Sequence, residues 1–123
     1  MSRRAEHARD EPDARRREEM SRRLGGAAVY PDARSLLQRE TAELVIIGSP
    51  PDSHRDLALL ALASGAHVLC EKPFMRSVEE ADEVIAAARS AGRTVRVNNQ
   101  YRYMPIYAEA KRRVAAGEFG EPY

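Results

Sequence analysis

The fold is decided by Leu44-Val-Ile-Ile-Gly-Ser-Pro-Pro-Asp-Ser-His54, followed one unit later by His67-Val-Leu-Cys-Glu-Lys-Pro73. Each stretch begins with an apolar run of strand length and then breaks at proline, with polar side chains around the break. Apolar residues at consecutive positions predict that the strand over 44–47 is covered on both faces. Two such strands ending side by side predict a ligand crevice at one edge of an open α/β sheet.

Helical patterns alternate with short apolar strands along the rest of the chain. Asp10-Glu-Pro-Asp13 is expected to open a helix with Pro12 in its first helical position, and Ser77 with Glu80 to form a capping box. The alternation predicts parallel strands joined by right-handed crossovers, within one domain in which residues 1–9 are disordered or a remnant strand. The other expected strands cover 27–30, 67–70 and 94–97, and the expected helices cover 10–24, 32–37, 52–64, 77–92 and 105–116.

The net charge, the apolar stretches and the cysteine count argue against several classes of function. The net charge is +1, so no overall field favours nucleic acid or a membrane surface. We expect no membrane span and no signal peptide, because the arginine-bearing start of the chain lacks an apolar stretch. The one cysteine, Cys70, excludes an intramolecular disulfide and indicates a reducing cytoplasm.

Arginines crowd the first expected helix, between Arg15 and Arg23. Such a cluster is either a patch for phosphate or nucleic acid or a solvated helix face. Glu18 and Glu19 lie among the arginines, and this mixture of signs favours the solvated face.

Polar groups follow three of the expected strands, in 49–54, 71–73 and 98–103. Ser49-Pro50-Pro51 is a rigid wall with few donors, against which a flat ring can pack, because proline lacks an N–H. Lys72 is the one lysine near the expected crevice; partial burial would let it exchange a proton near neutrality. The alternative for Lys72 is an ion pair with Glu71 or another carboxylate.

The remaining candidates carry less specific signals. His54 falls in the first turn of a helix, where the macrodipole disfavours an imidazolium, so a neutral capping or packing ring is expected. His67 and Cys70 point to opposite faces of one strand, so a zinc site is not expected, and Cys70 reads as a small core residue. Arg102, between two tyrosines, either holds an anionic substrate or cofactor phosphate or docks another domain.

Three motifs in order resemble the Gfo/Idh/MocA oxidoreductases: Ser49-Pro-Pro-Asp-Ser-His54, Gly65-Ala-His-Val-Leu-Cys-Glu-Lys-Pro73 and Asn98-Asn-Gln-Tyr-Arg-Tyr-Met-Pro105. That family comprises NAD(P)-dependent sugar and polyol dehydrogenases, with glucose–fructose oxidoreductase and inositol 2-dehydrogenase as its namesakes. The resemblance runs from about Asp10 to Tyr123. It implies a Rossmann domain, hydride transfer between a nicotinamide and a hydroxyl-bearing carbon, a small-molecule sugar or polyol substrate, and it allows a homo-oligomer.

The resemblance also implies roles for individual residues. Asp10 matches the acidic position whose side chain bonds the adenosine ribose of NAD, and the neighbouring Arg9 leaves NADP open. Lys72 matches the lysine beside nicotinamide and substrate, which positions the substrate hydroxyl or relays its proton, and Arg102 matches the loop on the substrate side. The implied cofactor contacts are Asp10, Ser49, Pro50, His54, Glu71, Lys72, Pro73 and Asn98; the implied substrate contacts are Lys72 and Arg102, and Lys72 is the implied catalytic residue.

The sequence departs from the family pattern at both ends. The family opens with a strand and a G-x-G-x-x-G turn that holds the pyrophosphate, and no such turn occurs here. The family's C-terminal substrate domain would follow Tyr123. We therefore expect an incomplete Rossmann-like sheet flanked by helices, lacking the first βα unit, that binds cofactor weakly or not at all.

Two further readings stay open at this point. One is a non-catalytic nucleotide-binding or interaction module that kept the fold and lost the activity. The other is an enzyme that uses Lys72 for Schiff-base chemistry, which requires a desolvated amine.

Overall fold

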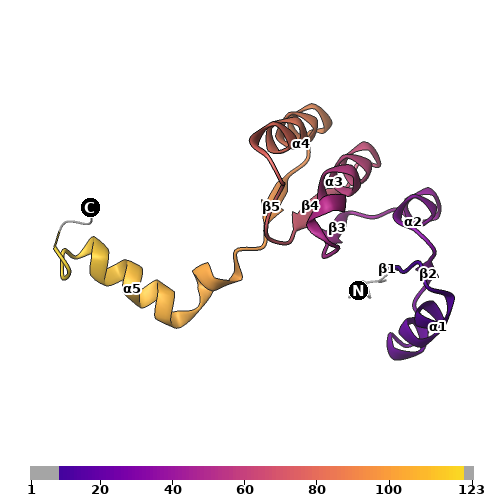
Figure 1. Ribbon diagram of the computed structural model, residues 1–123, viewed down its shortest axis with the longest axis horizontal. Helices are drawn as coiled ribbons and strands as arrows, with labels where there is room; N and C mark the ends of the chain where they lie inside the picture. The colour runs from indigo at the N-terminus through magenta and orange to yellow at the C-terminus, as the bar shows by residue number, and fades with distance from the viewer. Residues whose placement is uncertain (1–8, 121–123) are drawn as a thin grey trace, which may run out of the picture.

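Parallel strands form two separate sheets in the computed structural model, which describes residues 9–120. β1 (Arg9–Asp10) pairs with β2 (Val29–Tyr30) in a two-stranded sheet. β3 (Leu44–Ile47), β4 (His67–Cys70) and β5 (Val95–Val97) form a second sheet in the order β3-β4-β5. The expected incomplete parallel sheet is confirmed, and it is divided between β1 and β3 (Figure 1).

The helices lie on two sides of these strands. Figure 1 shows α2, α3 and α4 on one side of the strands and α1 on the other. α5 projects away from the rest of the molecule. The bounds are α1 (Ala14–Arg23), α2 (Ala33–Arg39), α3 (His54–Ala63), α4 (Val78–Ala91) and α5 (Pro105–Ala115), with short 3-10 turns η1 (Pro51–Ser53) and η2 (Gln100–Tyr103).

Side-chain caps explain where three of the helices begin. Asp13, Asp32 and Ser77 each accept a hydrogen bond from the backbone N–H three residues on, which satisfies an otherwise unpaired helical donor. α4 ends at Gly92, whose φ of 62° is the left-handed conformation that glycine adopts without strain.

Two expectations at helix starts are wrong. α1 begins at Ala14 rather than in the first helical position expected at Pro12, because Asp10 continues β1 and Asp13 is the cap. Glu80 does not close a capping box with Ser77, since its carboxylate accepts from the N–H of Arg76 at 3.0 Å. The expectation for residues 1–9 falls outside the described residues except at Arg9, which lies in β1.

The core lies between the three-stranded sheet and the helices α3 and α4. Its side chains come from one face of β3 and β4 and from the inward sides of the two helices. Ala58 and Ala61 are fully buried, and their small side chains leave room for Val68 and Cys70 from β4. The buried members are Ile47, Ala58, Ala61, Leu62, Val68, Cys70, Val84 and Ala88.

The other face of β3 is open, which corrects the expectation that this strand is covered on both faces. Leu44 and Ile46 are 53% and 67% exposed, whereas Ile47 is buried. An apolar run predicts that both faces suit burial, but no helix of residues 9–120 lies over this face.

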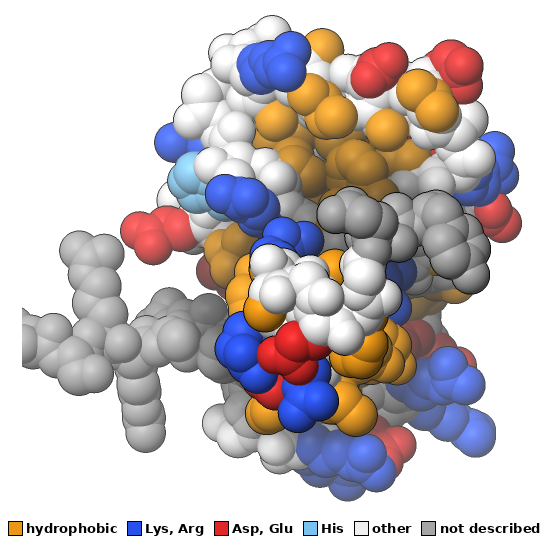
Figure 2. Space-filling view, turned by 90° about the vertical axis from the view of Figure 1, so that its left-hand side faces the viewer, with side chains coloured by type: hydrophobic (Ala, Val, Ile, Leu, Met, Phe, Trp, Pro, Cys, Tyr) orange, Lys and Arg blue, Asp and Glu red, His pale blue; other side chains and the backbone are white. Residues whose placement is uncertain are grey.

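α5 makes its contacts mainly with η2 and leaves all its side chains exposed. Figure 2 looks at the molecule from the α5 end and shows hydrophobic and charged side chains together on this side. Across residues 9–120, no helix has both the length and the apolar character needed to cross a membrane.

Candidate functional site

The carboxyl ends of β3, β4 and β5 lie in register at one edge of the sheet. Ile47 is opposite Cys70, and Cys70 is opposite Val97, so the segments that follow leave from the same edge. The N–H of Glu71 donates to the carbonyl of Ile47 at 2.9 Å, and the N–H of Asn98 donates to the carbonyl of Cys70 at 2.8 Å. The predicted convergence of three polar strand ends is therefore confirmed, and we call this edge the rim.

Glu71 is held in place by one hydrogen bond across the rim and one within its own segment. Its carboxylate accepts from the side-chain amide of Asn98 and from the backbone N–H of Lys72, the latter at 3.2 Å. These bonds lower the pKa of Glu71, with the Asn98 amide the main cause. Glu71 is thus a fixed carboxylate that joins the segments after β4 and β5.

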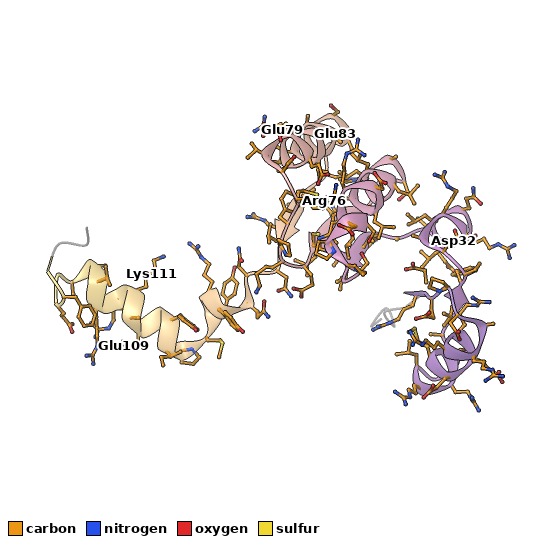
Figure 3. All side chains as sticks on the ribbon, viewed as in Figure 1. Asp32, Arg76, Glu79, Glu83, Glu109 and Lys111 are labelled. Atoms are coloured by element: carbon orange, nitrogen blue, oxygen red, sulfur yellow. The ribbon has the colours of Figure 1, made fainter. Side chains whose placement is uncertain are left out.

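Lys72 extends from the rim without an ion pair to Glu71. Its Nζ lies 5.1 Å from the ring centroid of Tyr101, a distance that allows a cation–π interaction. Tyr101 in turn stacks on Tyr107, with ring centroids 5.7 Å apart and planes inclined at 21°. Lys111, the other lysine, lies on α5 away from the rim (Figure 3).

His54 joins the turn after β3 to the turn after β4. It is fully buried at the start of α3. Its Nε2 lies 2.8 Å from the carbonyl oxygen of Ser49, and its Nδ1 lies 2.9 Å from that of Pro73 and 3.3 Å from that of Phe74. Both ring nitrogens therefore lie at hydrogen-bond distance from backbone carbonyls, and which of them donates depends on the tautomer. His54 is a buried ring at the start of α3 that links the two turns, in agreement with the expected capping or packing role.

An ion pair on the surface supports the same two turns. Arg76, in the segment after β4, pairs with Asp52 of η1 at 3.0 Å. Ser53 caps α3 by position but makes no side-chain capping bond; its hydroxyl instead lies 2.6 Å from that of Ser49. Ser49 and Pro50 are thereby held at the rim beside the Lys72–Pro73 segment.

Two candidate residues lie apart from this cluster. Asp10 ends β1 in the two-stranded sheet, where its side chain is exposed, and no described contact joins it to the rim. Arg102 is exposed in η2, and no hydrogen bond of its side chain is among the described contacts. The structure brings together the other candidates, which are Ser49, Pro50, His54, Glu71, Lys72, Pro73 and Asn98.

The remaining polar candidates have structural roles. Cys70 is fully buried, and burial raises the pKa of its thiol, which makes it a poor nucleophile. The Nδ1 of His67 accepts a hydrogen bond from the N–H of Thr94 at 3.0 Å, joining the starts of β4 and β5. In α1, Arg23 pairs with Glu19, in agreement with a solvated helix face.

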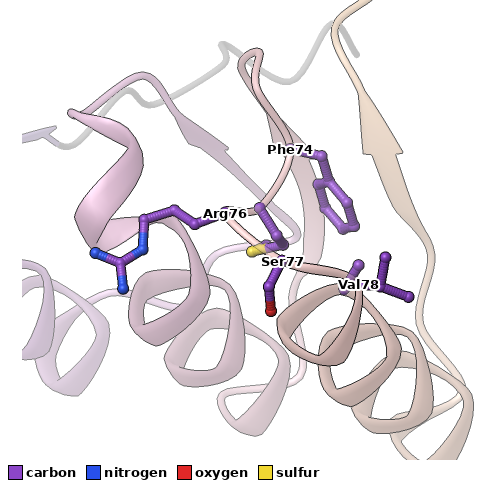
Figure 4. Close-up of a pocket in the computed structure, with 6 residues that line it drawn as sticks. Phe74, Arg76, Ser77 and Val78 are labelled. Carbon is purple, nitrogen blue, oxygen red and sulfur yellow. The ribbon is translucent and has the colours of Figure 1, made fainter.

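An open depression of about 370 Å³ lies beside the rim rather than on it. Figure 4 shows Phe74, Ser77 and Val78 there, where the segment after β4 enters α4. None of the residues with candidate chemistry lines this depression.

Two features of the site went beyond what the sequence pattern had indicated. Tyr101 had been noted as a neighbour of Arg102, not as the ring beneath Lys72, although an aromatic residue just after a rim strand is a usable signal. The contacts of His54 with Pro73 and Phe74 had no signal, because they join residues 19 and 20 positions apart across the fold.

Comparisons with known proteins agree on one family. The model of the Gfo/Idh/MocA oxidoreductases, described as an oxidoreductase family with an NAD-binding Rossmann fold, matches residues 8–99. The scyllo-inositol 2-dehydrogenase (NAD(+)) of Bacillus subtilis is 34% identical over 107 residues, which are 87% of this chain and 31% of that protein.

Solved structures show the same relationship. The WlbA dehydrogenase from Chromobacterium violaceum, in complex with NADH and UDP-GlcNAcA, superposes with a TM-score of 0.87 at 25% identity, covering 94% of this chain and 33% of that one. The myo-inositol 2-dehydrogenase from Lactobacillus plantarum superposes with a TM-score of 0.84 at 25% identity, covering 93% of this chain and 34% of that one.

The chain spans about a third of the length of the curated relatives it matches. The matched region contains β1 to β5 and the rim with Lys72. This chain belongs to the Gfo/Idh/MocA family of NAD-binding oxidoreductases.

Proposed function

We propose that these residues form part of an NAD-dependent dehydrogenase that acts on a sugar or polyol. The observation that carries the proposal is the exposed Lys72 amine at the carboxyl edge of three adjacent parallel strands, the edge where open α/β sheets bind ligands. Curated relatives with the matching region are dehydrogenases of inositols and of D-glucosides.

The residues at the rim fit one end of a dinucleotide. The turn at Ser49-Pro50 would lie along the cofactor, Glu71 and Asn98 would border the nicotinamide, and Asp10 would accept hydrogen bonds from the adenosine ribose. The exposed Asp10 carboxylate disfavours a 2′-phosphate at the same place, so we propose NAD rather than NADP. The sequence contains no G-x-G-x-x-G turn, so these residues do not account for holding the pyrophosphate.

Lys72 would act on the substrate hydroxyl. When NAD is bound, its nicotinamide accepts the hydride from the carbon that bears this hydroxyl. The amine of Lys72, held over the Tyr101 ring, would orient the substrate oxygen or relay its proton. Arg102 would contact the substrate from the segment after β5, next to the same edge.

The direct test is a titration of the 123-residue chain with NADH and NADPH, followed by nicotinamide fluorescence. We expect weak binding, with NADH favoured, and no turnover. Absence of any binding at millimolar NADH would contradict a cofactor site in this chain alone.

A chimera tests the chemistry. Residues 8–99 of this chain replace the matched region of the Bacillus subtilis scyllo-inositol 2-dehydrogenase, and NADH formation from scyllo-inositol is measured. A folded chimera that binds no NADH would overturn the proposal, and one that binds NADH without oxidising inositol would overturn the substrate class.

A further inference from the structure

Two stacked tyrosines lie where the chain passes from the rim into α5. Tyr101 belongs to η2 and Tyr107 to the first turn of α5, and their rings are stacked. The N–H of Met104 donates to the carbonyl of Tyr101, and the N–H of Tyr107 donates to the carbonyl of Met104, both at 3.0 Å. The backbone between the two rings is therefore held by hydrogen bonds, which fixes how the rings lie relative to each other.

The amine of Lys72 reaches this pair from the segment after β4. It lies over the ring of Tyr101, and the ion pairs of residues 9–120 do not include it. The neighbouring carboxylate of Glu71 is occupied by the amide of Asn98 and by the backbone N–H of Lys72 itself. Within residues 9–120, the Tyr101 ring is thus the described partner of the amine.

A ring face suits an amine that has to act on a ligand. It attracts the protonated amine through its quadrupole and accepts no conventional hydrogen bond. A carboxylate partner would accept one or more of the three N–H bonds and would compete with the ligand for them. The ring therefore limits where the flexible side chain lies and leaves its donors free.

We propose that Tyr101 is a positioning residue for Lys72 and that Tyr107 braces its ring from α5. The inference rests on the proposed function, because the amine that the ring places is the one assigned to the substrate hydroxyl. It also gives α5 a part in the site: the start of the helix fixes the ring, and the ring fixes the amine.

Lysine NMR of the full chain tests the contact. The chain has two lysines, so carbon-13 labelling of lysine gives two sets of ε-methylene signals, and Lys111→Arg removes one set and thereby assigns both. Protons above an aromatic face are shielded by its ring current. The ε-protons of Lys72 should therefore lie upfield of their position in the urea-unfolded chain.

Four variants localise the effect. Tyr101→Leu should return the Lys72 signal to its unfolded position, whereas Tyr101→Phe keeps the ring face and should keep the shift. Tyr107→Leu should reduce the shift, and an unchanged shift would overturn the bracing role. Tyr103→Leu is the control, because Tyr103 lies in the same 3-10 turn but is 83% exposed, and it should leave the signal in place. All three tyrosines are exposed, so these variants should fold.

A double-mutant cycle tests the role in the reaction, in a chimera extended to include residues 100–120. Tyr101→Leu should lower kcat about 2- to 5-fold, the range that a cation–π contact at an exposed site provides, and Tyr101→Phe should restore it. In a chimera that already carries Lys72→Ala, Tyr101→Leu should lower kcat no further, because the ring has no amine to place.

Two results would overturn the proposal. One is a Lys72 signal at its unfolded position in the parent chain. The other is an equal loss of kcat from Tyr101→Leu with and without Lys72, which would show that the ring acts on the fold alone. The spectra are recorded without cofactor or substrate, so they do not depend on the dehydrogenase function. An unchanged kcat for Lys72→Ala alone would count against that function and leave the spectra unaffected, which distinguishes the two failures.

Discussion

At the scale of single residues, the rim combines the exposed Lys72 amine with neighbouring groups that are held by hydrogen bonds. Glu71 is bonded to Asn98, and His54 holds the turns on either side, so the backbone that carries Lys72 is anchored at both ends. The lysine amine itself makes no described hydrogen bond and interacts with the face of Tyr101. This arrangement leaves its protons available to a ligand.

We predict that Lys72→Ala lowers kcat of the chimera by about 10²- to 10⁴-fold, the usual contribution of a group that moves a proton in the reaction. KM should change little by comparison, since the effect belongs to the reacting centre. Steady-state kinetics with inositol and NAD measure both quantities.

Lys111→Ala, which removes the lysine on α5, is the matched control and should leave kcat unchanged. It applies to a chimera extended to include residues 100–120. An unaltered kcat for Lys72→Ala together with a lower melting temperature would instead assign Lys72 a structural role.

We predict that His54→Gln lowers the free energy of unfolding by about 1–3 kcal/mol, because a glutamine side chain does not replace the buried ring that lies between the carbonyls of Ser49 and Pro73. Urea unfolding of the full chain measures this loss. His67→Gln is the control: it changes an exposed ring with one described bond and should cost less than about 1 kcal/mol.

At the scale of elements, α5 behaves as a separate helix that relies on its own side chains. Glu109 accepts hydrogen bonds from Arg112 and Arg113 at 2.8 Å, and the two guanidinium groups lower the pKa of Glu109 to about 2. Pairs three and four residues apart stabilise helices that lack tertiary support.

We predict that α5 loses helicity as the pH falls from 4.5 towards 2. The carboxylate form is favoured in the helix, so its stabilisation is complete above the usual pKa of 4.5 and disappears as Glu109 is protonated. Carbon chemical shifts of Ala108 and Ala110, followed by NMR across this range, report the change.

Glu109→Gln should remove that pH dependence and give the low-pH helicity at every pH. A transition that persists in this variant would show that another carboxylate, such as Glu118, controls the helix.

At the scale of the whole molecule, stability is concentrated in one half. Every buried core residue belongs to the part made of β3, β4, α3 and α4 or to the turns within it, while β1, β2, α1 and α2 contain none. A two-stranded sheet without a buried face is marginal by itself.

We therefore predict that hydrogen exchange is faster in 9–39 than in 44–91, with two separate protection levels. Mass spectrometry of peptic fragments measures both regions in one experiment. Equal protection across the two regions would show that α2 couples them into one cooperative unit.

Local chemistry made much of this structure predictable. The caps at Asp32 and Ser77, the strands over 44–47 and 67–70 and the helix stop at Gly92 follow from side chains and spacings within a few residues. The common edge for Ser49, Lys72 and Asn98 followed from the rule that parallel strands end together.

The errors arose where long-range contacts decide the outcome. From the sequence, Asp10 was expected to open a helix, whereas in the structure it pairs with β2. A strand of two residues has no periodicity of its own that could predict this pairing. Leu44 and Ile46 were expected to be buried but are exposed. A sequence shows that side chains suit burial, but not whether another element covers them.

The succession of strands and helices along the chain, the family and the rim residues were determined by the sequence alone, because they depend on periodicity, turn residues and motifs that are local. The division of the sheet, the carbonyl contacts of His54 and the ring beneath Lys72 were decided only by the tertiary structure. Each of these depends on which groups from distant parts of the chain meet, and that is set by packing across the whole fold.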